Sequence, residues 1–193
     1  FAVNIVLGVA LHKIVEKLTA DIRAAREKAD FVIFYPHVGG QVDPSPGLFT
    51  RYIFDKALEA GADAIVASHA HVVQRAGFRD GRLCAYSLGN FNMDPLSSLV
   101  LPEFLPYYGL AVHLYVEDKK ILKTTFSILK MTRKKGQQTQ TWPVDELYET
   151  LDEKGKAQLE AEVAKVPVSL HLDHCESYEG VMDAVEAGYS SVM

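Results

Sequence analysis

The sequence predicts a mixed α/β fold, in which helices and buried strands alternate before antiparallel strands take over. Three observations support this. Apolar positions early in the chain recur at helical spacing, short apolar runs rich in β-branched residues lie between those helices, and two turn signals later separate strand-like runs. Alternation of helices and strands implies parallel pairing through crossovers, whereas hairpins imply antiparallel pairing. We therefore expect both kinds of pairing in one body.

The first elements are two helices and two strands. Residues 11–29 have the apolar spacing of an amphipathic helix, and residues 31–35 form a continuous apolar run typical of a buried strand. A loop rich in Gly and Pro leads to a second helix that contains Phe49 and ends where Gly61 takes the C′ position. Residues 62–67 then give the second strand.

Two hairpins follow. Residues 72–78 and 82–88 flank Arg79-Asp80-Gly81, which is a strong hairpin signal. Residues 110–116 and 121–129 alternate in the same way around a charged turn. These runs account for the antiparallel part of the fold.

A charged helix is expected after the hairpins. It opens at Trp142-Pro143-Val144 and runs to about Lys165, and Gly155 interrupts its pattern, so two short helices stay open as an alternative. The basic run at residues 130–135 is most simply a solvated strand end or turn.

Bulk composition excludes several classes of function. The 193 residues are 48% hydrophobic and 23% charged, as in an ordinary globular protein, and the net charge of −5 gives no footprint for nucleic acid. The sequence contains no transmembrane run and no signal peptide, and both of its ends look cut. Cys84 and Cys175 do not make a disulfide framework, which slightly favours a reducing, cytoplasmic compartment; envelope association of a full-length protein stays open.

Three histidines stand out because each follows a predicted strand. His37 comes after residues 31–35, and His69 and His71 come after residues 62–67. The carboxyl ends of parallel strands are where open α/β sheets build their sites, and imidazole is the commonest metal ligand among side chains. A lone histidine is more often structural, but the HxH pair with a third histidine favours a shared metal or phosphate. Three imidazoles still leave a two-metal centre without its bridging carboxylates or amide.

Four motifs, taken in order, resemble the CapA family of poly-γ-glutamate capsule-biosynthesis proteins, whose fold is similar to that of calcineurin-like metallophosphoesterases. They are YPHVGGQ at 35–41, AGADAIV at 60–66, SHAHVVQ at 68–74 and YSLGNF at 86–91. The resemblance covers roughly residues 1–165. It implies a sandwich of two mixed sheets flanked by helices, incomplete here, with a divalent metal (Mn, Fe or Zn) at one sheet edge.

The resemblance also assigns roles by position. His37, His69 and His71 stand where the family has metal-binding and phosphate-binding histidines, and His37, His69 and Asn90 are the catalytic candidates within this region. Asn90 and Ser87 fall in a loop that lines the site, although a tight turn with Gly89 at an unusual backbone angle explains this loop equally well. Such a site would activate water for attack on a phosphoester or a γ-glutamyl-type amide, with a histidine protonating the leaving group.

Two departures weaken the expected activity. Val38 replaces a usual aromatic residue, and Ala67-Ser68 replaces a common Gly-His. The motifs of the family's first half, which supply its carboxylate and amide ligands, are also absent. If the chain acts alone, we expect weak metal binding and little or no hydrolysis.

Residues 166–193 resemble a second family, the class II zinc-dependent fructose- or tagatose-bisphosphate aldolases. The motif is VPVSLHLDHC at 166–175, and by position Asp173 is a proton-transfer residue and His174 a zinc ligand. A catalytic zinc needs three protein ligands, and the other aldolase histidines are missing. We expect a strand, a helix over 178–187 and a second strand, forming a βαβ appendage to the body at 1–165.

Three functions follow from this sequence. The first is a CapA-like metal-dependent hydrolase domain associated with capsule synthesis and incomplete as it stands. The second is a non-catalytic binding or assembly module of a capsule system, and the third is a fragment of an aldolase. The expected partners are a small-molecule or polyglutamate-type substrate and other capsule-synthesis proteins.

Overall fold

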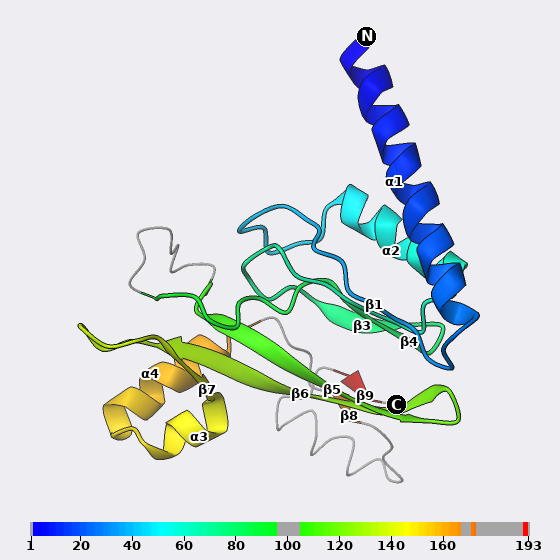
Figure 1. The fold of residues 1–193 in the computed structure, drawn as a ribbon. Helices are drawn as coiled ribbons and strands as arrows, with labels where there is room; N and C mark the ends of the chain where they lie inside the picture. The colour runs from blue at the N-terminus through cyan, green and yellow to red at the C-terminus, as the bar shows by residue number, and fades with distance from the viewer. Residues whose placement is uncertain (1, 96–104, 167–170, 173–190, 193) are drawn as a thin grey trace.

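The computed structural model describes residues 2–95, 105–166, 171–172 and 191–192. Two sheets lie against each other, with helices on the outer side of the first sheet and at one end of the second (Figure 1). The elements are α1 (Ala2–Arg26), β1 (Ile33–Phe34), α2 (Leu48–Ala60), β2 (Ala64–Val66), β3 (Ala76–Arg79), β4 (Arg82–Ala85), β5 (Tyr108–Glu117), β6 (Lys120–Thr132), β7 (Gln140–Pro143), α3 (Val144–Glu149), α4 (Glu153–Val163), β8 (His171–Leu172) and β9 (Ser191–Val192).

The first sheet has the strand order β1-β2-β4-β3. The β1–β2 and β2–β4 pairs are parallel and the β3–β4 pair is antiparallel, as the sequence predicts. The β3–β4 hairpin turns at Asp80-Gly81, both with positive φ (51° and 72°), which is the backbone of a type I′ turn. All three residues of β2 are buried, so this strand is the centre of the sheet.

The second sheet has the order β5-β6-β7 and is antiparallel throughout. The β5–β6 hairpin was expected, but β7 was not. The sequence predicts a helix that opens at Trp142-Pro143-Val144. α3 does begin at Val144, but Trp142 pairs with Lys130 and Pro143 with Leu129 as part of β7. β7 is an edge strand, and an edge tolerates proline because one side of the strand needs no hydrogen-bond donor.

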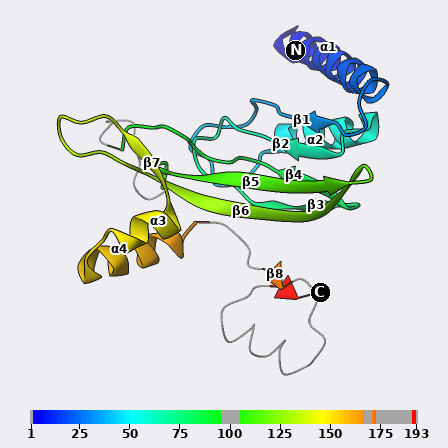
Figure 2. The same ribbon diagram turned by 60° about the horizontal axis from the view of Figure 1, so that its bottom comes forward.

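The core has two layers that meet at the first sheet. Ile65 and Ala67 pack against the helices, together with Phe54 of α2 and Ile22 of α1. On the other face Ala64, Val66, Leu83 and Ala85 pack against side chains of β5 and β6 that include Val112 and Leu114. Figure 2 shows the same order of layers from below. The expected sandwich of two sheets flanked by helices is therefore confirmed.

The helices differ in how well the sequence located their ends. Gly61 ends α2 in the left-handed conformation (φ 107°), and its N–H bonds back to the carbonyls of the last turn, as expected. α1 extends from Ala2 to Arg26 rather than over 11–29. The apolar residues before 11 have no polar face, so their pattern carries no helical period. None of the helices in the described part of the chain is long and apolar enough to span a bilayer.

The expected charged helix is two helices, broken before Gly155 rather than at it. α3 ends at Glu149 and α4 begins at Glu153. Asp152 is the N-cap of α4, because its Oδ1 accepts a hydrogen bond of 2.8 Å from the N–H of Gly155. Gly155 therefore lies in the first turn of α4, where the cap closes on it.

The C-terminal strands β8 and β9 pair in parallel, His171 with Ser191 and Leu172 with Val192. Parallel pairing agrees with the βαβ unit expected for residues 166–193. The helix expected over 178–187 lies outside the described residues.

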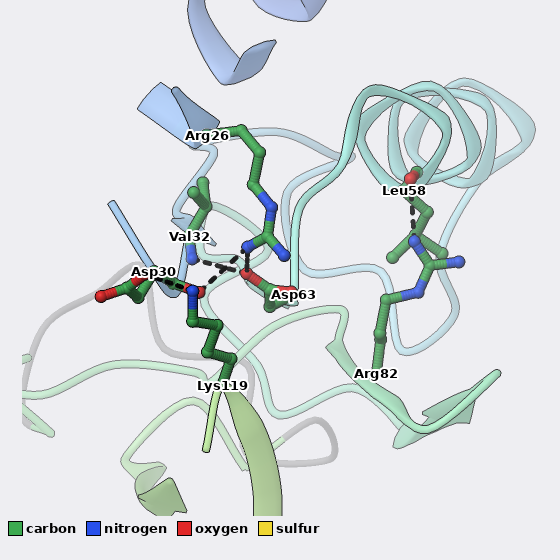
Figure 3. Close-up of polar contacts among 7 residues, drawn as sticks. All are labelled: Arg26, Asp30, Val32, Leu58, Asp63, Arg82 and Lys119. Atoms are coloured by element: carbon green, nitrogen blue, oxygen red, sulfur yellow. Dashed lines mark hydrogen bonds and ion pairs between the residues drawn. The ribbon is translucent and has the colours of Figure 1, made fainter. Parts of the chain in front are cut away.

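A polar cluster joins α1 to the amino ends of β1 and β2 (Figure 3). One carboxylate oxygen of Asp63 accepts hydrogen bonds from the backbone N–H of Val32 (2.7 Å) and from the Arg26 guanidinium. From the turn of the second sheet, Lys119 pairs with Asp30 at 2.6 Å and holds the pKa of that exposed carboxyl below its ordinary value. These contacts fix the two strands side by side, so that their carboxyl ends open at the opposite edge.

Candidate functional site

His37 and His69 lie next to each other because the pairing of β1 and β2 continues past both strands. His37 and Ser68 form an isolated parallel bridge, with the N–H of Val38 donating to the carbonyl of Ser68 (3.0 Å) and the N–H of Ser68 donating to that of Pro36 (3.2 Å). The residues that follow two adjacent parallel strands thus emerge at one sheet edge.

The three imidazole rings are neighbours at this edge. The ring centroids of His37 and His69 are 4.6 Å apart in an edge-to-face arrangement, and those of His69 and His71 are 6.3 Å apart. These distances make His69 a direct neighbour of both His37 and His71. The ring of His37 is exposed, whereas His69 and His71 are partly buried.

The backbone around the rings is strained. His69 and His71 have positive φ values of 130° and 59°, and so does Val42 at 53° in the loop beside them. Non-glycine residues in such conformations cost of order 1–3 kcal/mol each and persist only where surrounding contacts impose them. One such contact is the 2.7 Å hydrogen bond from the N–H of Val42 to the carbonyl of Ala70.

Asn90 reaches the cluster from the loop after β4. Its Nδ2 lies 2.9 Å from the carbonyl of His71 and 2.7 Å from that of Pro106, and carbonyl oxygens can only accept hydrogen bonds. The amide orientation is thereby fixed, with Oδ1 facing Nδ1 of His71 at 2.8 Å. Because that oxygen is an acceptor, Nδ1 of His71 carries the proton, and a neutral ring keeps its lone pair on Nε2.

The other two rings differ in their partners. Nδ1 of His37 lies 3.3 Å from the Ser68 hydroxyl, so Ser68 orients that ring. Nδ1 of His69 is buried and has no hydrogen-bond partner among the described residues. A buried nitrogen without a partner is uncommon and calls for an explanation, such as an ion or a ligand.

The cluster matches a metal ion in donor type but lacks carboxylates. Three imidazoles suit zinc or iron, and the Nδ1 of His69, which has no partner within the described residues, fits a ligand atom. Within the described ranges, however, no group of three or more His, Cys, Asp or Glu side chains is arranged to hold a metal. The donor set therefore fits part of a metal centre.

The remaining sequence-predicted site residues are Asp173, His174 and Ser87. Asp173 and His174 lie outside the described residues. Ser87 is buried, and its hydroxyl accepts a hydrogen bond from the N–H of Gly89 within the same turn (3.2 Å), which is the structural alternative that the sequence left open.

Three residues that the sequence did not single out support the site. Gln74 is buried and donates from Nε2 to the carbonyl of Asp43 (2.7 Å), which ties the strained loop to the HxH segment. The backbone at Pro106 and Tyr108 holds Asn90. A glutamine eight residues after the end of β2 has no sequence signature of its own, so only its burial identifies it.

Comparison with known proteins divides the chain in two. Residues 7–95 match the family of the bacterial capsule synthesis protein PGA_cap. The PGA biosynthesis protein CapA of Bacillus subtilis is 37% identical over 73 residues, which are 38% of this chain and 19% of that protein. The capsule biosynthesis protein CapA of Bacillus anthracis is 36% identical over 66 residues, 34% of this chain and 16% of that protein. The chain thus spans about a fifth of the capsule proteins it matches.

The C-terminal part matches a different family. Residues 127–193 match class II fructose-bisphosphate aldolases. The fructose-bisphosphate aldolase of Thermus caldophilus is 54% identical over 33 residues, 17% of this chain and 11% of that enzyme. The match begins within β6, although residues 127–166 pack with β5 and β7 in the second sheet.

Both resemblances found in the sequence are therefore confirmed. The matched capsule-family residues include α2 and β1 to β4. They also include the three histidines of the cluster, His37, His69 and His71, and Asn90 beside them. The region that carries this cluster is therefore similar to bacterial capsule-synthesis proteins of the CapA type.

Proposed function

We propose that this chain supplies the histidine-bearing part of a metal-dependent hydrolase site in a protein associated with capsule synthesis. The capsule association comes from the CapA relatives, whose names assign them to capsule or PGA biosynthesis. Hydrolysis is a more specific activity than these names state, and the geometry of the three imidazoles supports it.

The observation that carries the proposal concerns Nδ1 of His69, next to two neighbouring imidazoles. This nitrogen is buried and has no hydrogen-bond partner in the described part of the chain. Leaving a buried polar atom without a partner costs about 1–3 kcal/mol, and backbone strain at His69 and His71 adds to that cost. A fold that needed these histidines only for packing would gain stability by losing them. A ligand that binds here offsets the cost.

The chain's own residues have separable tasks in this proposal. A divalent ion bound by the imidazoles of His69 and His71 would polarise the substrate and lower the pKa of water. Asn90 holds the proton on Nδ1 of His71 and so presents Nε2 to the site. The exposed ring of His37, whose Nδ1 lies 3.3 Å from the Ser68 hydroxyl, would hand a proton to the leaving group.

Hydrolysis at enzymatic rates needs carboxylate or amide ligands in addition to these imidazoles. We assign those ligands to the remaining four-fifths of the family's length. The chain by itself should therefore bind a metal weakly and hydrolyse little. Phosphoesters and γ-glutamyl-type amides are the two substrate classes that suit the site.

Metal titration tests the proposal. Purified chain is titrated with Zn²⁺ and with Mn²⁺ by calorimetry, alongside His69→Ala, His71→Ala and the control His113→Ala. His113 is an exposed histidine on β5, where its Nε2 faces the Ser127 hydroxyl at 3.3 Å. We expect the two site variants to lose about tenfold or more in affinity and the control to keep it.

Two results would overturn the proposal. One is the absence of metal binding by the wild-type chain, and the other is binding that survives both site substitutions. Either result would favour a non-catalytic binding or assembly role for the cluster.

A further inference from the structure

Asn90 is also held by the segment that leads into β5. The Asn90 side chain donates to the carbonyl of Pro106 at 2.7 Å, and its backbone N–H donates to the carbonyl of Tyr108 at 3.4 Å. The Asn90 side chain bonds to His71 of the imidazole cluster. Asn90 is thus also fixed to the start of the second sheet.

The backbone around Asn90 is packed tightly against the backbone at the start of β5. A Cβ added to Gly109 would lie 2.0 Å from the carbonyl oxygen of Asn90, and one added to Gly89 would lie 2.7 Å from the carbonyl oxygen of Tyr108. The two backbones therefore touch directly. A shift of the 106–109 segment must be passed on to Asn90.

The side chain of Tyr108 is fixed in turn by α4. Tyr108 is fully buried, and its hydroxyl donates a 2.8 Å hydrogen bond to Oε2 of Glu162. Lys130 donates to the same oxygen at 2.6 Å, and its ammonium also lies over the Tyr108 ring, 5.2 Å from the centroid. The expectation that Lys130 belongs to a solvated strand end is therefore wrong: its side chain is only 17% exposed.

The charges of this group are balanced. Burial by itself raises the pKa of Glu162, but hydrogen bonds from Lys130, Gln158 and Tyr108 outweigh burial and hold the pKa below its ordinary value. Glu162 is therefore an anion at neutral pH with three donors arranged around it. Such a carboxylate is a firm acceptor for one tyrosine hydroxyl.

We propose that Glu162 on α4 is a positioning residue for the histidine cluster, acting through Tyr108 and Asn90 on the ring of His71. Its importance for chemistry rests on the proposed function. Glu162 lies in the region that matches aldolases, whereas Asn90 and His71 lie in the region that matches capsule proteins. The structure thus makes residues of the second region part of the support of a site in the first.

The test uses metal-free, ¹⁵N-labelled chain and four variants. Tyr108→Phe removes one hydroxyl, Glu162→Ala removes the acceptor, and Glu162→Gln restores an acceptor oxygen. The matched control is Tyr148→Phe. It removes a 2.7 Å hydrogen bond from the Tyr148 hydroxyl to the carboxylate of Glu160, which lies on α4 as Glu162 does. The readouts are solvent exchange of the Asn90 side-chain amide and the ring ¹⁵N shifts of His71, with the His113 ring as internal reference.

Tyr108→Phe and Glu162→Ala should speed exchange of the Asn90 amide about fivefold to tenfold, the effect of one lost hydrogen bond, and shift the His71 signals. Glu162→Gln should return both toward wild type, and Tyr148→Phe should change neither. A purely structural role of Glu162 would lower global stability while leaving the Asn90 and His71 signals of the folded protein unchanged.

Unchanged Asn90 and His71 signals in folded Tyr108→Phe would overturn the inference, even if Glu162→Ala failed to fold. These readouts need no metal, so failure of the proposed function would appear separately, as absent metal binding by the wild-type chain. Where metal does bind, Tyr108→Phe should also lower the Zn²⁺ affinity relative to Tyr148→Phe.

Discussion

Asn90 and His71 are joined by two hydrogen bonds that run in opposite directions. The His71 ring donates from Nδ1 to Oδ1 of Asn90 at 2.8 Å, and Nδ2 of Asn90 donates back to the carbonyl of His71 at 2.9 Å. The pair fixes both the ring tautomer and a backbone carbonyl at a residue with positive φ. A single amide therefore holds the strained residue and orients its imidazole.

Replacing this amide by a carboxylate should be costly. Asn90→Asp places an anion against the carbonyl oxygens of His71 and Pro106, which have lost their donor. We expect a loss of about 1–3 kcal/mol in the free energy of unfolding, measured by urea denaturation. Asn92→Asp is the control, because Asn92 is exposed two residues further along the same loop. Equal effects of the two substitutions would show that the Asn90 amide holds nothing in place.

The carboxylate of Glu162 should make stability depend on pH. Its pKa in the folded protein lies below the ordinary value of 4.5, because the hydrogen bonds from Lys130, Gln158 and Tyr108 outweigh burial. A lowered pKa means that the contribution is present above pH 4.5 and is lost as pH falls through the lower, folded-state value.

Urea denaturation of wild type and Glu162→Gln at several pH values between 3 and 7 measures this contribution. Wild type should be more stable near neutral pH, and the difference should shrink on acidification below 4.5. Glu160→Gln, an exposed position on the same helix, is the control. A difference that is constant over the whole range would remove the ionised carboxylate from the explanation.

Asp63 should be important for the packing of α1 on the sheet. Its carboxylate accepts from the backbone N–H of Val32 and from Arg26, and its side chain is only 16% exposed. Asp63→Ala leaves a partly buried N–H without a partner, so we expect a loss of about 1–3 kcal/mol in the free energy of unfolding.

Asp21→Ala is the control for Asp63, because Asp21 pairs with Lys17 on the exposed face of α1. Exposed pairs of this kind contribute about 0–1 kcal/mol. Chemical denaturation of both variants, followed by circular dichroism, compares them directly. If the two losses were similar, the link between α1 and the strands would be of no special importance.

The sequence located those parts of the fold that have local signals. Gly61 marks the end of α2, Asp80-Gly81 marks the first hairpin, and the apolar runs mark the parallel strands whose ends bring His37 and His69 together. In each case the signal lies within a few residues of the structure it specifies, or depends on the rule that parallel strands end at one edge.

The support of the site carried no such signal. His71 and Asn90 are separated by 19 positions in the sequence, and Tyr108 and Glu162 by 54. Pairings at these distances have no period, and Tyr108 looks like any apolar strand residue. β7 was missed for a related reason: Trp142-Pro143 before a charged run resembles a helix start, and only pairing with β6 makes it a strand.

The strain at Val42 predicts a substitution that stabilises the protein. Val42 has φ 53°, where a β-branched residue is disfavoured by about 1–3 kcal/mol, while glycine adds an entropy cost of about 0.5–1 kcal/mol. Val42→Gly should therefore raise the free energy of unfolding by about 1 kcal/mol. Val42→Ala is the discriminating control, because alanine also avoids positive φ and should bring no gain. Thermal and urea denaturation of both variants measure the difference. If alanine stabilised the protein as much as glycine, the backbone angle would not be the cause, and the loop beside the histidines would store no strain.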